Sequence, residues 1–239
     1  HAAENLTAGD TVLMREGTYH ESFYISQGGN EGKPVTFSAY PDERPVIDGT
    51  RVTDSQNGLI INQSYITLSG LEICNWEENA VWVEQAAHIE ISDCEIHDVC
   101  YGIGFADGSH HFECNRVIVH QFDLYGFDVS SSGGVDCHQG TFNDCIAHTG
   151  RDRGQNVDGF ALGHGTQHDF TFNRCQAYDV FDGFDISARN TFLNRCASYN
   201  CWNGGYKLWQ DEVILMNCLA YKNIISNVEL DWDGESGTT

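Results

Sequence analysis

Short stretches in which apolar and polar residues alternate recur along the chain, separated by turns rich in Gly, Asn and Asp. Five of them share one frame around a glycine: YGIGFA from Tyr101, YGFDVS from Tyr125, DGFALG from Asp158, DGFDIS from Asp182 and GGYKLW from Gly204. A period of two places the apolar side chains on one face of a β-strand. The pattern therefore predicts short strands of about five residues, with pairs such as Phe184 and Ile186 pointing into a core.

The frame returns at nearly regular intervals. With a further copy, SNVELD from Ser226, the successive spacings from Tyr101 to Ser226 are 24, 33, 24, 22 and 22 residues. Regular self-similarity is typical of repeat architectures. The LxxLxL pattern of leucine-rich repeats is absent, and propeller blades would need longer units. Coils of about 22 residues without helical patterning predict an all-β, right-handed parallel β-helix, whose coils stack about 4.8 Å apart.

A second repeated phrase lies between the glycine frames and carries a cysteine. Its copies surround Cys94, Cys145, Cys175, Cys196 and Cys218, and Val117 takes the same place in the coil between the first two. A column of small apolar side chains stacked in a core accounts for this register without redox chemistry. Disulfide formation is the alternative, and it would more readily involve the cysteines outside the column, which are Cys74, Cys100, Cys114, Cys137 and Cys201.

Turn residues and the opening phrases extend the same architecture. Asn75, Asp98, Asp179 and Asn200 fall at equivalent turn positions and favour bent backbone. AGDTV, EGTY and GKPVTFSAYPDERPVIDG are interpreted as the first coils. A short N-terminal cap helix is expected, because HAAENLTAGDTV resembles the end of an amphipathic helix that runs into a strand. The prediction is one parallel β-helix domain over residues 1–239.

Charge restricts the partners. The chain has 35 acidic residues against 12 Lys and Arg, a net charge of −23. Nucleic acid and anionic lipid need a basic face, so both are disfavoured, and no apolar run is long enough to span a membrane. The balance suits a secreted protein, a salt-adapted one or one that holds cations, although a solvated surface accounts for most of the acids. We expect a secreted, extracellular protein.

Stacking the glycine frames in register creates a candidate site. The residue before the glycine is aspartate in two adjacent coils, Asp158 and Asp182, and three positions further the outward column holds Asp185 and then Lys207. Glycines between these columns would keep the surface low, so that a ligand can approach. Carboxylates about 5 Å apart repel one another unless a cation neutralises them, and Ca²⁺ prefers several oxygen ligands. A nearby cation favours a neutral lysine that acts as a base; for Asp185 and Lys207 alone, a surface salt bridge is the alternative.

The motifs GQNVDGFALG, RCQAYDVFDGFDIS and NCWNGGYKLW together resemble polysaccharide lyase family 9, the Ca²⁺-dependent pectate lyases with a right-handed β-helix. The likeness covers nearly the whole chain, and these three motifs are its specific part. The resemblance implies a Ca²⁺ cofactor held by Asp158, Asp182 and Asp185, with Lys207 as catalytic base. Phe181 stands where the family commonly has the first of two consecutive aspartates, so one carboxylate is lost.

The reaction implied by the resemblance is β-elimination on pectate or a polygalacturonate-like acidic polysaccharide. Ca²⁺ would bind the C6 carboxylate and stabilise the developing enolate, while the amine of Lys207 removes the C5 proton. A polyanion must then approach a protein of net charge −23. Candidate substrate contacts near the site in sequence are Arg151, Arg153, Arg189 and Trp209.

Two other functions stay open on the sequence. A non-catalytic β-helix could be structural, filament-forming or glycan-binding, since exposed strand edges invite pairing; we expect a monomer or end-to-end self-association. A glycoside hydrolase would need an acid and a base carboxylate about 5–10 Å apart, and the outward column offers Asp128, Asp185 and Glu229.

Overall fold

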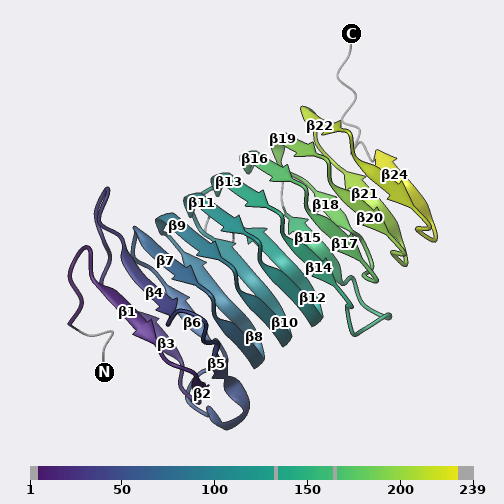
Figure 1. The fold of residues 1–239 in the computed structure, drawn as a ribbon. Helices are drawn as coiled ribbons and strands as arrows, with labels where there is room; N and C mark the ends of the chain where they lie inside the picture. The colour runs from purple at the N-terminus through teal and green to yellow at the C-terminus, as the bar shows by residue number, and fades with distance from the viewer. Residues whose placement is uncertain (1–4, 132–133, 164–165, 231–239) are drawn as a thin grey trace.

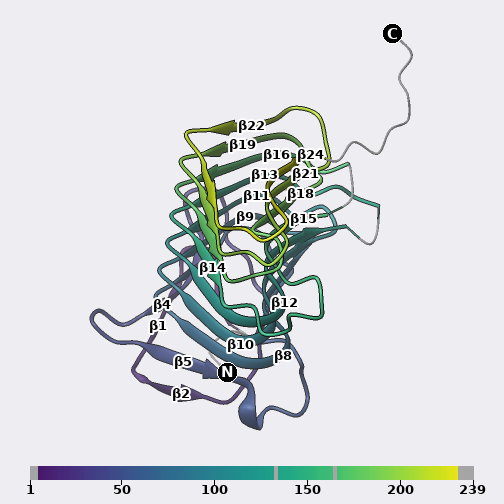
Figure 2. The same cartoon turned by 90° about the vertical axis from the view of Figure 1, so that its right-hand side faces the viewer.

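The computed structural model describes residues 5–131, 134–163 and 166–230. Figures 1 and 2 show parallel strands wound into coils that stack in chain order from the N-terminal to the C-terminal end. The predicted parallel β-helix is confirmed. The expected cap helix falls partly on residues 1–4, outside the described residues, and residues 5–10 lead into the first strand without a helix. Within the described ranges no helix is long and apolar enough to cross a membrane.

The first face of the β-helix is a nine-stranded sheet. Its strands, in spatial order, are β1 (Thr11–Met14), β4 (Val35–Ala39), β7 (Ile66–Ser69), β9 (Ala87–Ser92), β11 (His110–Asn115), β13 (His138–Asn143), β16 (His168–Asn173), β19 (Arg189–Asn194) and β22 (Val213–Met216). This order follows the chain, so each coil adds one strand beside that of the coil before.

The second and third faces share three long strands that bend from one face to the other. These are β8 (Glu72–Glu84), β10 (Glu95–Ala106) and β12 (Ile118–Ser130). Their first parts continue the second face, which also holds β2 (Gly17–Tyr19), β5 (Pro45–Asp48), β14 (Ile146–His148), β17 (Gln176–Tyr178), β20 (Ala197–Tyr199) and β23 (Leu219–Tyr221). Their last parts continue the third face, with β3 (Phe23–Ile25), β6 (Leu59–Ile61), β15 (Asp158–Leu162), β18 (Phe184–Ile186), β21 (Gly204–Leu208) and β24 (Ser226–Leu230). A 3-10 turn, Gly49–Arg51, follows β5.

The bend between the second and third faces is made by residues in the left-handed backbone region. Asn75 has φ 61° and Asp98 has φ 55°, and Asp179 and Asn200 repeat these values at 53° and 56°. Asn and Asp tolerate this region because their short polar side chains bond to nearby backbone. The four turn positions predicted as equivalent are therefore confirmed.

The interior is filled by ladders of stacked side chains. Phe127, Phe160, Phe184 and Tyr206 lie one above another with ring centroids 4.7, 4.8 and 5.0 Å apart. The cysteine column is buried as predicted from Cys94 to Cys196, with Val117 in register with Cys145. All ten cysteines are free, so the disulfide alternative is not observed. Stacking of like side chains at the coil spacing fixes the register of every coil against its neighbours.

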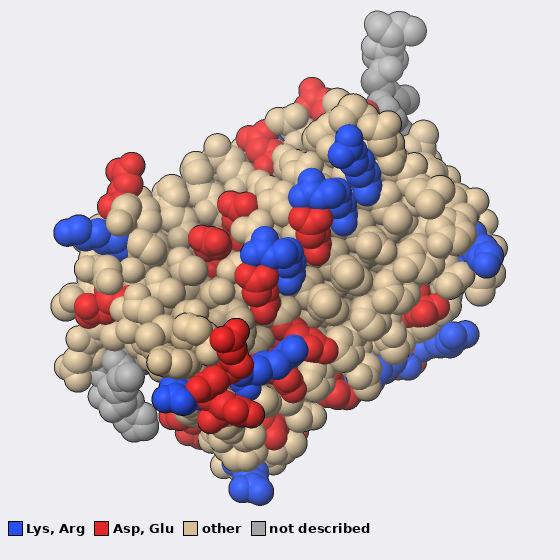
Figure 3. Space-filling model, in the orientation of Figure 1, with Lys and Arg blue, Asp and Glu red and all other residues tan. Residues whose placement is uncertain are grey.

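Much of the positive charge is used on the outside of the coils, away from the third face. At the turn that precedes the cysteine column, Arg116 makes two hydrogen bonds of 2.7 Å to Asp93, and Arg174 makes two of 2.6 Å to Asp144. Figure 3 shows acidic and basic side chains alternating in a line along the stack. Exposed pairs of this kind contribute little to stability, because water screens them. Because these arginines are paired with aspartates, few basic side chains remain to bind an anionic ligand.

Candidate active site

The candidate site is built where β15, β18 and β21 run side by side on the third face. Ala161 pairs with Asp185, and Asp185 pairs with Lys207. Asp158 begins β15, and Asp182 lies two residues before β18 in the next coil. The parallel register therefore brings the four predicted residues together from three coils.

The three carboxylates form a compact cluster with the amine at its edge. One oxygen each of Asp158, Asp182 and Asp185 lies within 4.8 Å of the other two. Nζ of Lys207 is 3.5 Å from Oδ2 of Asp182 and 3.6 Å from Oδ2 of Asp185. Asp158 and Asp182 are buried, whereas the side chains of Asp185 and Lys207 are each 17% exposed. The cluster is thus shielded on the protein side and open on the side of the last two residues.

Asp182 is held by one oxygen and presents the other to the cluster. Its Oδ1 accepts hydrogen bonds from the backbone N–H of Gly204 at 2.6 Å and from Nδ2 of Asn203 at 2.9 Å. Its Oδ2 is buried and accepts no hydrogen bond from the described residues; it faces only the more distant Nζ of Lys207. Burying a carboxylate oxygen without a hydrogen bond lowers the stability of the fold, unless a cation or a water molecule binds that oxygen.

The other two aspartates are also fixed by donors on one side. Asn156 donates to Oδ2 of Asp158 at 2.8 Å. Nε1 of Trp209 donates to Oδ1 of Asp185 at 2.6 Å, and Nζ of Lys207 lies 4.7 Å from the centre of the same indole ring. Trp209 was predicted as a substrate contact; its indole N–H also orients a candidate metal ligand, a role that the sequence pattern did not indicate.

The glycines of the frame are needed for a different reason from the one expected. A Cβ on Gly183 would lie 2.0 Å from Oγ of Ser198 and 2.6 Å from the carbonyl oxygen of Gly205. Gly204, which precedes the frame glycine Gly205, is restricted as well, because a Cβ on it would lie 2.8 Å from Oδ1 of Asp182. The space is therefore occupied by the neighbouring coil and by the carboxylate, so these glycines permit the close approach of protein atoms rather than of a ligand.

Burial and the repulsion between the three carboxylates determine the protonation of the cluster. Burial raises the pKa of Asp158 well above its usual range, and the charges of Asp182 and Asp185 raise it further. Burial likewise raises the pKa of Asp182 and of Asp185, although the ammonium of Lys207 offsets part of the effect. Burial alone would lower the pKa of Lys207, but the three carboxylates outweigh it and raise that pKa.

These features fit a hard divalent cation. Three carboxylates in one place carry more negative charge than Lys207 neutralises, and Oδ2 of Asp182 lacks a donor. Ca²⁺ is bound through several oxygens at about 2.3–2.6 Å. The side chain of Phe181 packs against the core and offers no oxygen ligand.

A groove of 570 Å³ runs from the cluster across the third face toward the earlier coils. Among the residues that line it are Asp158, Asp185 and Trp209 at the cluster and, from the earlier coils, Glu78, Asn79, Trp82, Tyr101, Tyr125 and Asp128. Aromatic faces of this kind suit the apolar faces of sugar rings. None of its described lining residues is Lys or Arg.

The aromatic part of the groove was missed at the sequence level, although a signal existed. Tyr101 and Tyr125 occupy the column of Asp158, and Asp128 occupies the column of Asp185. Residues that share a column share a face, so the same stacking argument that located the cluster would have extended the site toward the N-terminal coils. Burial raises the pKa of Asp128 to about 6.

Comparisons with known proteins agree with this architecture. The family model described as Pel9A-like, right-handed β-helix region matches residues 1–237. The chain belongs to this family. Pectate lyase PEL9 of Emericella nidulans is 25% identical over 191 residues, which cover 77% of this chain and 43% of that protein. Uncharacterized protein YwoF of Bacillus subtilis is 35% identical over 111 residues, which cover 41% of this chain and 24% of that one. The chain thus matches less than half the length of these relatives.

The Pel9A-like fold is also seen in a solved structure. The crystal structure of pectate lyase Pel9A superimposes with a TM-score of 0.76 and 15% identity, covering 98% of this chain and 72% of that one. At this identity the likeness shows the fold alone. The fold class inferred from the repeats is therefore established by family and by structure.

Within the Pel9A-like coils, the three predicted arginine contacts lie outside the lining of the groove. Arg151 pairs with Asp123 at 2.6 Å, Arg153 lies over the ring of Trp202 at 4.6 Å, and Arg189 begins β19 on the first face. Proximity in sequence does not place residues on one face, because each coil carries its residues around three faces. Trp209 is the predicted contact that does line the groove.

Proposed function

We propose that these Pel9A-like coils carry the active site of a secreted, Ca²⁺-dependent polysaccharide lyase that cleaves pectate or polygalacturonate-like chains by β-elimination. One observation carries the proposal: the carboxylates of Asp158, Asp182 and Asp185 lie within 4.8 Å of one another, with the amine of Lys207 beside two of them and a groove leading to the cluster. An acid cluster that only served as a solvated surface would not be buried beside an amine.

Each residue then has a defined part in the reaction. Asp158, Asp182 and Asp185 would hold Ca²⁺, which when bound supplies positive charge to a uronate carboxylate and so makes its C5 proton more acidic. Lys207 would accept that proton as a neutral amine, a form that Ca²⁺ among the three aspartates would favour because the cation offsets the carboxylates that otherwise raise the pKa of Lys207. The electron pair of the C5–H bond forms the C4–C5 double bond, and the C4–O bond breaks. Its electrons leave with the glycosidic oxygen, which takes up a proton.

The remaining groove residues would position the chain. Trp209 holds Asp185 by its indole N–H, so the acid keeps one oxygen free for the cation. Tyr101 and Tyr125, with ring centroids 5.7 Å apart, and Trp82 would receive the sugars that follow the cleavage point. With no lining Lys or Arg among the described residues, the charge of the substrate would be met chiefly by Ca²⁺ and Lys207.

The test is a lyase assay on polygalacturonate with and without Ca²⁺. The unsaturated product absorbs in the ultraviolet, and we expect this absorbance to appear with Ca²⁺ and to disappear with a chelator. Lys207→Ala should abolish turnover while Ca²⁺ binding persists. Lys222→Ala, which alters an exposed lysine at a turn after β23, is the matched control and should keep the wild-type rate. Normal turnover in Lys207→Ala would refute the assignment of the base.

A glycoside hydrolase is the second candidate, and Asp128 favours it. This acid lines the groove with a pKa of about 6, as suits a proton donor. It lies two coils from Asp185 in one column, roughly 10 Å at the coil spacing, near the upper end of the separation used by inverting hydrolases. Reducing ends without ultraviolet absorbance, lost in Asp128→Asn, would support it. A purely structural role would give neither signal, and self-association end to end stays a prediction.

A further inference from the structure

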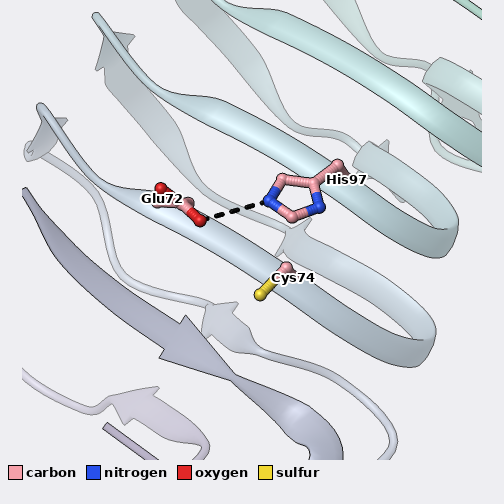
Figure 4. A group of neighbouring side chains, drawn as sticks. All are labelled: Glu72, Cys74 and His97. Atoms are coloured by element: carbon pink, nitrogen blue, oxygen red, sulfur yellow. Dashed lines mark hydrogen bonds and ion pairs between the residues drawn. The ribbon is translucent and has the colours of Figure 1, made fainter. Parts of the chain in front are cut away.

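A second group of possible metal ligands lies on the second face, away from the groove. Glu72 and Cys74 are two residues apart on β8, so their side chains leave the strand on the same side. His97 of β10 is the register partner of Cys74. Figure 4 shows the imidazole of His97 directed at the carboxylate of Glu72, with Cys74 on the same strand as Glu72. One ligand atom of each lies within 4.8 Å of the other two.

The imidazole of His97 is aimed at this group by a second carboxylate. Its Nδ1 lies 2.9 Å from Oδ2 of Asp98, and its Nε2 lies 3.3 Å from Oε1 of Glu72. Histidines that bind metals almost always engage a carboxylate, carbonyl or water through the other ring nitrogen, which fixes the ring. In this site the carboxylate of Asp98 engages Nδ1 of His97, so Nε2 of the same ring is directed at Glu72 and Cys74.

The other two ligand atoms are also supported. Nε of Arg44 lies 2.9 Å from Oε2 of Glu72, so this arginine offsets one charge and leaves Oε1 directed at His97. Sγ of Cys74 is buried and accepts a hydrogen bond of 3.2 Å from Nδ2 of Asn75. Glu72 and His97 remain 25% and 20% exposed, so an ion can reach them from solvent.

We propose that Glu72, Cys74 and His97 form a binding site for a transition-metal dication of the Zn²⁺ type, distinct from the calcium-type acid cluster. One sulfur, one nitrogen and one oxygen are the donor types that Zn²⁺ accepts, whereas Ca²⁺ takes oxygen ligands. Two ligands bound to Zn²⁺ at about 2.0–2.1 Å in tetrahedral geometry lie about 3.3 Å apart, which matches the 3.3 Å between Nε2 of His97 and Oε1 of Glu72. Three protein ligands leave a fourth position for water.

The next coil provides an internal comparison. His120 follows His97 in the column with ring centroids 5.1 Å apart, and its Nε2 lies 3.0 Å from Oε1 of Glu95. This pair repeats the histidine and the glutamate, but the place of the thiol is taken by His97. The cysteine therefore distinguishes the proposed site from an otherwise similar pair, and variants at His120 serve as controls.

The experiment uses the full chain with Ca²⁺ in excess, so that the acid cluster is saturated, and adds Co²⁺ as a spectroscopic probe. One equivalent of Co²⁺ should bind and give a thiolate-to-cobalt charge-transfer band, and Zn²⁺ should displace it. Cys74→Ser should abolish the band, and His97→Gln should weaken binding by about tenfold or more. Cys100→Ser and His120→Gln should behave as the wild type does.

Absence of the charge-transfer band in the wild type, or its persistence in Cys74→Ser, would overturn the proposal. If Cys74→Ser does not fold, X-ray absorption of the Zn²⁺-loaded wild type decides the question. We expect one sulfur neighbour at about 2.3 Å together with nitrogen and oxygen neighbours at about 2.0–2.2 Å; a shell of nitrogen and oxygen alone would overturn it. Neither readout depends on lyase activity, so the outcome is separate from that of the proposed function.

Discussion

Trp209→Phe isolates a single hydrogen bond in the candidate active site. The substitution keeps an aromatic ring beside Lys207 but removes the indole N–H that donates to Oδ1 of Asp185 at 2.6 Å. That bond holds the carboxylate with its other oxygen toward Lys207 and the cluster. Without this hydrogen bond the carboxylate of Asp185 can rotate. A cation that binds must then fix its orientation, which reduces the free energy of binding.

The expected size follows from the type of bond. A hydrogen bond to a charged group contributes about 1.5–3 kcal/mol. The side chain of Asp185 is 17% exposed, so water replaces part of the lost interaction, and we take about 1–2 kcal/mol. This corresponds to a loss of roughly fivefold to thirtyfold in Ca²⁺ affinity.

The assay is calorimetric titration of Ca²⁺ into the wild type and the variant, followed by turnover measured over a range of Ca²⁺ concentrations. Trp202→Phe is the control, because the buried Nε1 of Trp202 has no hydrogen-bond partner among the described residues. It should leave Ca²⁺ affinity unchanged. Equal affinity in Trp209→Phe and wild type, or an equal loss in Trp202→Phe, would refute the reasoning.

Three further predictions test the core, the groove and the packing of the site. Phe184→Ala interrupts the buried ring ladder and should lower the free energy of unfolding by about 3–5 kcal/mol in urea titration; a loss below about 1 kcal/mol would contradict the packing. The folded-state pKa of Asp128 is raised to about 6 from 3.8, so its contribution to stability is complete below pH 3.8 and is lost as pH rises to about 6. The stability of the wild type relative to Asp128→Asn should therefore fall by about 3 kcal/mol in total, from well below pH 3.8 to well above pH 6, and parallel pH profiles would exclude this. Gly204→Ala places a Cβ 2.8 Å from Oδ1 of Asp182 and should weaken Ca²⁺ binding, whereas Gly163→Ala meets no atom within 4 Å and should bind Ca²⁺ normally.

The sequence by itself determined the coil architecture and the pairing of the acid cluster. Parallel strands in register place equivalent residues of successive repeats side by side, so a repeat visible in the chain becomes a set of neighbours in space. Asp185 and Lys207 are 22 residues apart in sequence and are register partners in the structure. The cysteine column was predictable for the same reason.

Tertiary structure decided what lies between the columns and which way each side chain turns. Each coil crosses three faces, and at left-handed residues such as Asp98 the alternation of side chains breaks down. Arg151, expected near the substrate, pairs with Asp123. The register of Asn75 and Asp98 makes Cys74 and His97 neighbours, but only the fold brings their ligand atoms and that of Glu72 within 4.8 Å of one another. Hydrogen-bond direction, such as that from Trp209 to Asp185, depends on atoms supplied by the adjacent coil, so only the folded arrangement specifies it.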